Sequence, residues 1–174
     1  MPSNRRNVVM TTKTASLWQR ALRDSRLQDL PFKIETNAQG QLILSPHKPA
    51  HSHKQSQILR LLDRHVARSG ESIVEFAVDT PQGIKVPDVV WISEERWAQV
   101  SDGAEASPVM PELCVEVLSE TNTTDEMAAK RALYFDAGAE EMWTCDLGGS
   151  VRFYTPEGEQ DASTLAPSVP TTIE

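Results

Sequence analysis

The chain has 174 residues, of which 39% are hydrophobic and 24% are charged, and this composition is typical of one soluble globular domain with a real core. Its 17 lysines and arginines against 25 aspartates and glutamates give a formal net charge of −8, which argues against a protein that coats nucleic acid through a broad basic surface. The same balance does not exclude an enzyme that acts on nucleic acid through metal ions in a local cleft.

The sequence carries no signal for a membrane or for export. No apolar run approaches the ~20 residues that span a bilayer, so no membrane contact is expected. The start, MPSNRRNVVM, has two arginines but no long apolar stretch after them, which argues against a signal peptide. Cys114 and Cys145 both fall in strands that look buried, so we expect reduced thiols and a cytoplasmic protein.

The chain divides into three parts. Residues 1–13 are polar and irregular and are expected to form a flexible N-terminal arm. Residues 14–155 carry the patterns of helices and strands and are expected to form a single domain. Residues 156–174 are rich in Pro, Ser and Thr, and this tail is expected to be mobile or to add an edge strand.

Helical and strand patterns follow one another through the first half of the domain. Apolar residues at helical spacing predict helices over about 14–27 and about 51–69, the second ended by Gly70. The turn-like Ala-Gln-Gly at 38–40 predicts a hairpin between FKIETN and QLILS. The next predicted elements are strands over 72–79 and 84–92, joined by a turn at 81–83.

The second half continues with a short helix over EERWAQV and a strand over 112–119. Thr123 and Glu126 then fit a capping box, which opens a helix that runs to about Ala137, with Gly138 as its C-terminal cap. A strand over 141–146 pairs with VRFYT after it. From residue 51 the order is therefore helix, three strands, helix, strand, which predicts an α/β domain with one sheet covered by helices.

Two carboxylates interrupt strands that otherwise look buried. Glu116 lies within PELCVEVLSE and Asp88 within VPDVVWI, and a buried carboxylate loses hydration worth several kcal/mol unless a cation or strong donors replace the water. Because side chains alternate along a strand and consecutive strands are usually neighbours, both groups can converge on one point. Two such carboxylates do not both ionise cheaply without a cation between them, and Mg²⁺ or Mn²⁺ held by oxygen ligands meets that need.

The same repulsion makes a prediction about stability. Substituting Asp88→Asn is expected to leave the metal-free fold intact or more stable, because one of two repelling charges is removed.

A lysine interrupts the inward face of the helix that follows Glu116. Met127, Lys130, Tyr134 and Ala137 recur at helical spacing, so Lys130 is expected to point inward and to reach back toward the carboxylates. Two carboxylates, a metal ion and a lysine are the parts of a phosphodiester hydrolase, in which the metal activates a water and the lysine orients it or neutralises the developing charge.

Each of these residues also has a purely structural interpretation. Asp88 follows Pro87 and could start a strand or cap a turn. Glu116 could form a buried pair with a structural arginine or lysine, and Lys130 could lie along the surface with its ammonium in water. The joint pattern favours the functional interpretation, because three charges interrupt three otherwise apolar faces in consecutive elements.

Taken together, these motifs resemble the PD-(D/E)xK nuclease superfamily, and more closely its Uma-type family of restriction-endonuclease-like proteins. The resemblance covers roughly residues 33–155. It implies a restriction-endonuclease-like core, with a central mixed β-sheet flanked by helices. The residues that carry it are GQLILSP, His51 at the start of a helix, VPDVVWIS, PELCVEVLSE, Asp125, Lys130, Tyr134, and Gly138 through AEEMWTCD.

The resemblance implies that Asp88 and Glu116 bind Mg²⁺ or Mn²⁺ and that Lys130 is the catalytic lysine. In the superfamily pattern the lysine stands two residues after the glutamate, where this chain has Leu118. The resemblance therefore implies a lysine that has migrated from the strand to the following helix.

Four further residues are expected to support the site. Relatives carry a glutamate where this chain has Gln41, and Glu35 on the same hairpin is the alternative acid. Ser119 and Tyr134 are expected to act as supporting donors. His51 is expected to cap its helix or to approach a phosphate.

Three histidines, His47, His51 and His53, lie close together and raise zinc as an alternative metal. No cysteines stand at matching positions, and the carboxylates favour a hard cation with oxygen ligands. We therefore expect an oxygen site rather than a zinc site.

The function predicted from these features is a metal-dependent endonuclease that hydrolyses phosphodiester bonds, with DNA as substrate and a homodimer to supply two sites. One alternative is a nuclease fold kept as a binding module without catalysis, which the acidic charge balance keeps open. Another is an RNase or a repair-type nuclease that uses the same residues on a different substrate.

Overall fold

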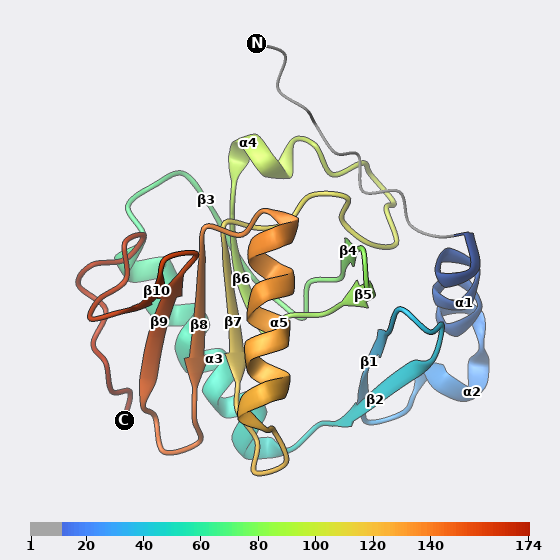
Figure 1. Cartoon of the computed structure of the whole chain (residues 1–174), viewed down its shortest axis with the longest axis horizontal. Helices are drawn as coiled ribbons and strands as arrows, with labels where there is room; N and C mark the ends of the chain where they lie inside the picture. Colours follow the sequence, from blue (N-terminus) through green and yellow to red (C-terminus); the bar gives the residue numbers. More distant parts are fainter. Residues whose placement is uncertain (1–11) are drawn as a thin grey trace.

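The computed structural model describes residues 12–174, so the predicted arm at 1–13 lies almost wholly outside the described residues. A six-stranded sheet forms its centre (Figure 1). Neighbouring strands run antiparallel except the two central ones, β7 and β8, which are parallel. In sheet order the strands are β10 (Gly158–Gln160), β9 (Val151–Thr155), β8 (Glu141–Cys145), β7 (Leu113–Val117), β6 (Val89–Ser93) and β3 (Gly70–Val74).

One long helix covers each face of this sheet, α3 (Pro49–His65) behind and α5 (Thr124–Ala137) in front (Figure 1). The residues of each strand alternate between the two helices, as the pleat requires. Val115 and Val117 belong to the apolar cluster that contains residues of α3, whereas Cys114 belongs to the cluster that contains residues of α5. Glu116 therefore shares the face of Cys114 and lies under α5, and the predicted mixed sheet flanked by helices is confirmed.

The start and end of α5 follow the predicted capping pattern. The Thr123 hydroxyl accepts a hydrogen bond from the Glu126 amide at 3.2 Å, and the Glu126 carboxylate accepts one from the Thr123 amide at 3.4 Å. Gly138 ends the helix with a φ of 114°, which a residue with a side chain rarely adopts. These two caps fix which residues of α5 face the sheet.

The predicted strands over 72–79 and 84–92 are each broken in two. Glu75 has a φ of 51°, so the chain leaves the sheet after β3, and Pro87 has no N–H with which to continue a strand ladder. The residues between these breaks form a separate hairpin of β4 (Val78–Thr80) and β5 (Gly83–Lys85). As a result Asp88 lies immediately before β6 rather than inside a strand.

An N-terminal hairpin, formed by β1 (Phe32–Thr36) and β2 (Leu42–Pro46), lies beside the small hairpin and outside the main sheet (Figure 1). The Thr36 hydroxyl accepts a hydrogen bond from the Ile84 amide at 2.7 Å, and the Glu35 carboxylate accepts one from the Val86 amide at 2.7 Å. Both contacts hold the hairpin close to Asp88. The remaining elements are the helices α1 (Thr12–Arg23), α2 (Ser25–Gln28) and α4 (Glu94–Trp97).

Two predicted helices have different boundaries in the structure. The helix predicted over 14–27 is divided, because the Asp24 side chain accepts a hydrogen bond from the Arg26 amide and caps a second short helix. The helix predicted from residue 51 begins at Pro49, whose fixed φ suits a first helical position, and Lys48 is its N-cap. His51 is therefore not the helix cap. This helix ends at His65 with Val66 as its C-cap, so the predicted end at Gly70 is wrong, and Gly70 instead begins β3. Within residues 12–174, no helix combines the length and the apolar character needed to cross a membrane.

The packed part of the domain extends beyond the predicted boundary at residue 155. Residues 158–160 form the edge strand β10, and Ala166, Val169 and Ile173 lie in the apolar cluster under α3. The buried Glu141 carboxylate accepts hydrogen bonds from the Thr164 and Leu165 amides and fastens this segment to β8. The tail belongs to the domain because a few apolar residues among its prolines and serines are buried.

Gly83 provides a test of the contact that holds the N-terminal hairpin in place. It has a φ of 96°, and a Cβ there would lie 2.8 Å from the Thr36 carbonyl oxygen. Gly83→Ala is expected to lower the free energy of unfolding by about 2–4 kcal/mol, measured by urea denaturation. Gly103→Ala is the matched control, because Gly103 has a φ of 77° with nothing within 4 Å, and about 1 kcal/mol is expected. Equal losses in the two variants would contradict the close contact.

Candidate active site

Asp88 and Glu116 face each other at one end of the central sheet. Val89 of β6 pairs with Val115 of β7, and the antiparallel register places the two acidic residues opposite one another. Both are buried, with exposed fractions of 1% and 4%. The ammonium of Lys33, from β1, lies 2.8 Å from Asp88 Oδ1 and 3.7 Å from Glu116 Oε2. The two carboxylates thus converge on one cationic group.

The second oxygen of Glu116 is held by α5. Lys130 Nζ lies 2.9 Å from Glu116 Oε1, and the Tyr134 hydroxyl donates a hydrogen bond to the same oxygen at 2.6 Å. Lys130 Nζ also lies 3.5 Å from Glu35 Oε1, which connects α5 to the N-terminal hairpin. Lys130 and Tyr134, which the sequence placed on the inward face of this helix, therefore both contact the carboxylate of Glu116.

The remaining contacts of Asp88 come from β7 and from α3. Asp88 Oδ2 accepts a hydrogen bond from the Val117 amide at 2.7 Å, and Gln55 Nε2 donates to Oδ1 at 3.3 Å. His51 Nε2 lies 3.3 Å from Asp88 Oδ2 and 3.2 Å from the Val117 carbonyl oxygen. A backbone carbonyl oxygen is thus part of the same cluster as the two carboxylates.

The surrounding donors keep Asp88 ionised. Burial alone would raise the pKa of Asp88, but the hydrogen bond with His51 and the charge of Lys33 outweigh it, so its pKa lies well below its usual range. The hydrogen bond with Asp88 raises the pKa of His51 in turn. These contacts favour a loss of stability in Asp88→Asn over the predicted unchanged or higher stability of the metal-free fold, because the partners of Asp88 compensate its charge.

Both lysines remain charged near neutral pH. Burial would lower the pKa of Lys33 and of Lys130, but Glu116 and the other nearby carboxylates outweigh burial, so both pKa values are raised. Burial raises the pKa of Tyr134 well above its ordinary value, and the charge of Glu116 adds to this effect, so Tyr134 keeps its proton. Lys130 and Tyr134 are consequently donors here and not bases.

Comparisons with known proteins show the family and the fold of the chain. A model of the Uma2 family, described as "Putative restriction endonuclease", matches residues 24–172. The chain belongs to the Uma2 family. A crystal structure from Anabaena variabilis, titled as a putative nuclease belonging to DUF820, has the same fold with a TM-score of 0.65 and 18% sequence identity, over 79% of this chain and 86% of that one. A search of curated proteins finds no match.

Not every residue predicted for the Uma2 site lies in the cluster. Glu35, His51 and Tyr134 do, together with Asp88, Glu116 and Lys130. Ser119 instead bonds with Thr121 and Asn122 in the turn that leads into α5, because β7 ends before it. The three neighbouring histidines also diverge, since His47 pairs with Glu75, His51 lies against Asp88 and His53 is exposed.

Lys33 and Gln55, which the structure places in the cluster, were not predicted from the sequence. Lys33 stands two residues before Glu35 on one strand, so both share a face, and that spacing could have revealed the lysine once Glu35 was under consideration. Gln55 lies one helical turn after His51 on α3. Neither residue interrupts a clearly apolar pattern, so the sequence pattern alone gives no signal that either belongs to the site.

The donor set suits a hard cation in part. In residues 12–174 no three His, Cys, Asp or Glu side chains stand together as a ready metal site. The carboxylates of Asp88 and Glu116 nevertheless lie in one cluster with the Val117 carbonyl oxygen. In the metal-free protein the ammonium of Lys33 contacts both carboxylates. Oxygen ligands of this type are those that Mg²⁺ and Mn²⁺ prefer. The two carboxylates and the carbonyl oxygen therefore supply part of a ligand set for such an ion.

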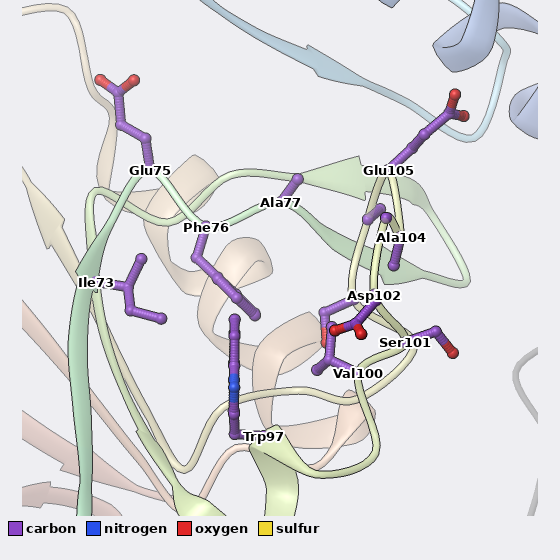
Figure 2. Close-up of a pocket in the computed structure, with 13 residues that line it drawn as sticks. Ile73, Glu75, Phe76, Ala77, Trp97, Val100, Ser101, Asp102, Ala104 and Glu105 are labelled. Carbon is purple, nitrogen blue, oxygen red and sulfur yellow. The ribbon is translucent and has the colours of Figure 1, made fainter.

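A separate hollow lies outside this cluster, between β3 and the loop at 100–107 (Figure 2). It has a volume of about 310 Å³, and Figure 2 shows Phe76 and Trp97 directed toward each other within it. Asp102 also lines it, whereas Glu75 and Glu105 point away in this view. Asp102 gives this hollow a negative wall, and neither Lys33 nor Lys130 lines it. The hollow therefore does not suit a phosphate group.

Proposed function

We propose that the chain is a metal-dependent endonuclease that hydrolyses phosphodiester bonds in DNA. The observation that carries this proposal is the convergence of Asp88 and Glu116 on one cationic group, with Lys130 on the far side of Glu116. Membership of a family described as putative restriction endonuclease supports the same reaction class. A purely structural ion pair would need one lysine, and this cluster holds two lysines against three buried carboxylates.

The residues proposed to hold Mg²⁺ or Mn²⁺ are Asp88 and Glu116, with the Val117 carbonyl oxygen as a third donor. Such an ion, when bound, makes a water molecule acidic and stabilises negative charge on a phosphate. His51 and Gln55 orient the Asp88 carboxylate, and Tyr134 orients that of Glu116. Each carboxylate is thereby kept in place before any ion arrives.

The role proposed for Lys130 is electrostatic. Its ammonium stays charged, so it donates hydrogen bonds to a phosphate oxygen or to the attacking water and does not take up a proton. Glu35 holds Lys130 from the other side and sets the direction of its Nζ. This role follows the resemblance, in which Lys130 stands in for a lysine at the position of Leu118.

We also propose that two copies act together, because two sites are needed to cut two antiparallel strands. The formal charge of −8 implies weak binding to DNA in the absence of metal ions, so substrate affinity is expected to depend on the ion. Light scattering and band-shift measurements with and without Mg²⁺ test both points.

The deciding experiment is a metal titration with three substrates. Duplex DNA, single-stranded DNA and RNA of one sequence are incubated with the purified chain in EDTA and then in Mg²⁺ or Mn²⁺. Cleavage of duplex DNA that requires the ion is expected. Preferential cleavage of RNA or of single strands would support an RNase or a repair-type nuclease instead, and no cleavage of any substrate would support a binding module without catalysis.

A further inference from the structure

Lys33 occupies the place where the two proposed ligand carboxylates meet. Its Nζ lies 2.8 Å from Asp88 Oδ1 and 3.7 Å from Glu116 Oε2, and its side chain is 12% exposed. Metal–oxygen distances for Mg²⁺ are about 2.0–2.1 Å, so an ion bound to these same two oxygens would lie almost on top of the ammonium. The two cations exclude each other, both by volume and by charge.

The charges of the cluster give the same result. Three buried carboxylates, Glu35, Asp88 and Glu116, face the ammonium groups of Lys33 and Lys130. A divalent ion added to this set would leave an excess of positive charge in a buried place. The same ion in exchange for the Lys33 ammonium would add one unit of positive charge to the cluster instead of two.

We propose that Lys33 is a built-in competitor for the metal, which neutralises Asp88 and Glu116 in the metal-free protein and swings out when the ion binds. This inference rests on the proposed function, because it assumes the metal site at these carboxylates. The two lysines then differ in role. Lys130 contacts the opposite oxygen of Glu116, Oε1, and stays in place, whereas Lys33 shares the oxygens that the ion needs.

The position of Lys33 in the fold permits such a movement. It stands on β1, in a two-stranded hairpin outside the main sheet, and its side chain is not fully enclosed. A lysine has a flexible four-carbon stem, so its ammonium can leave the carboxylates and reach water while the strand stays where it is. The carboxylates keep other partners when Lys33 leaves, because Gln55, His51 and the Val117 amide contact Asp88 and Tyr134 donates to Glu116.

The test is a measurement of Mn²⁺ affinity by calorimetry on metal-free protein, without any substrate. Lys33→Met removes the competing charge and keeps the length of the side chain, so the Kd for Mn²⁺ is expected to fall by about tenfold or more. Lys85→Met is the matched control, because Lys85 is a nearby lysine whose Nζ donates to the Thr36 carbonyl oxygen at 2.9 Å and not to Asp88. A change of less than about threefold is expected there.

Lys33→Gln guards against a variant that does not fold, because glutamine is neutral but still donates a hydrogen bond to Asp88. It is expected to bind Mn²⁺ more tightly than the wild type, and to show a larger rise in Tm on adding Mn²⁺. Unchanged or weaker Mn²⁺ binding in both Lys33 variants, with a wild type that does bind, would overturn the competition and leave the proposed metal site intact. Absence of Mn²⁺ binding in every protein would overturn both.

A crystal structure of the wild type with Mn²⁺ gives a second readout. The ion is expected between Asp88 and Glu116, with Lys33 Nζ displaced from Asp88 Oδ1. An ammonium still 2.8 Å from that oxygen, with the ion bound elsewhere, would refute the exchange.

Discussion

Replacing Lys130 with alanine is expected to slow the cleavage of duplex DNA by about 10²–10³-fold under saturating Mg²⁺, because a single preorganised donor to a developing negative charge is typically worth that much. The ammonium lies 2.9 Å from Glu116 Oε1 and is held charged in a buried position, where electrostatic interactions are strong. Mn²⁺ binding is expected to survive, since a lysine ammonium is not a metal ligand. Single-turnover cleavage and calorimetry measure the two effects separately.

Arg131→Ala is the control for Lys130→Ala. It removes a neighbouring cation from the same helix, but the Arg131 guanidinium lies over the Tyr154 ring, 4.2 Å from its centre, and away from the carboxylates. Near wild-type cleavage is expected. Moving the group back, as Lys130→Ala with Leu118→Lys, is expected to recover part of the lost rate. Full activity in Lys130→Ala would end the mechanism of the migrated lysine.

The second large effect is expected from Asp88→Asn, which should abolish metal-dependent cleavage and also weaken the fold. Asparagine cannot replace the charge that Lys33 and His51 compensate, and breaking a buried ion pair costs about 3–5 kcal/mol. Because the folded pKa of Asp88 lies below its unfolded value of about 3.9, its charge stabilises the fold at neutral pH, and this contribution is lost as the pH falls below about 4.

Urea denaturation at pH 7 and at pH 3 measures this contribution, and Asp63→Asn, at an exposed position on α3, is the control. The difference between wild type and Asp88→Asn is expected to be large at pH 7 and to shrink at pH 3. A variant that unfolds at the same urea concentration as the wild type at pH 7 would show that the partners of Asp88 contribute nothing. Undiminished cleavage in Mg²⁺ would remove Asp88 from the proposed metal site.

Local patterns in the sequence were enough to predict much of the fold around Glu116. Alternation along 113–117 gives the face of each residue, and the box formed by Thr123 and Glu126 gives the start of α5. Helical spacing from that start then gives the inward direction of Lys130. Each of these inferences depends on neighbours in sequence, and for that reason each could be made without the structure.

The parts that could not be predicted depend on contacts between distant segments. The turn at Glu75 and the interruption at Pro87 lie within runs of apolar residues that look like continuous strands, and the segment between them bonds with the distant N-terminal hairpin. The sequence around Lys33 gives no sign of its role either, because its partner Asp88 lies 55 positions further along the chain. The proposed roles of all these residues remain predictions.

The site combines residues that lie far apart in the sequence, from Lys33 to Tyr134, and this spacing has a consequence for synthesis of the protein. Lys33 and Asp88 leave the ribosome well before Glu116 and Lys130, and the parallel strand β8 must follow before the sheet can hold β7 on both sides. A nascent or truncated chain that lacks α5 therefore carries acidic residues without their lysine partner on that helix. The proposed nuclease site is therefore complete only after α5 has been synthesised and packed against the sheet.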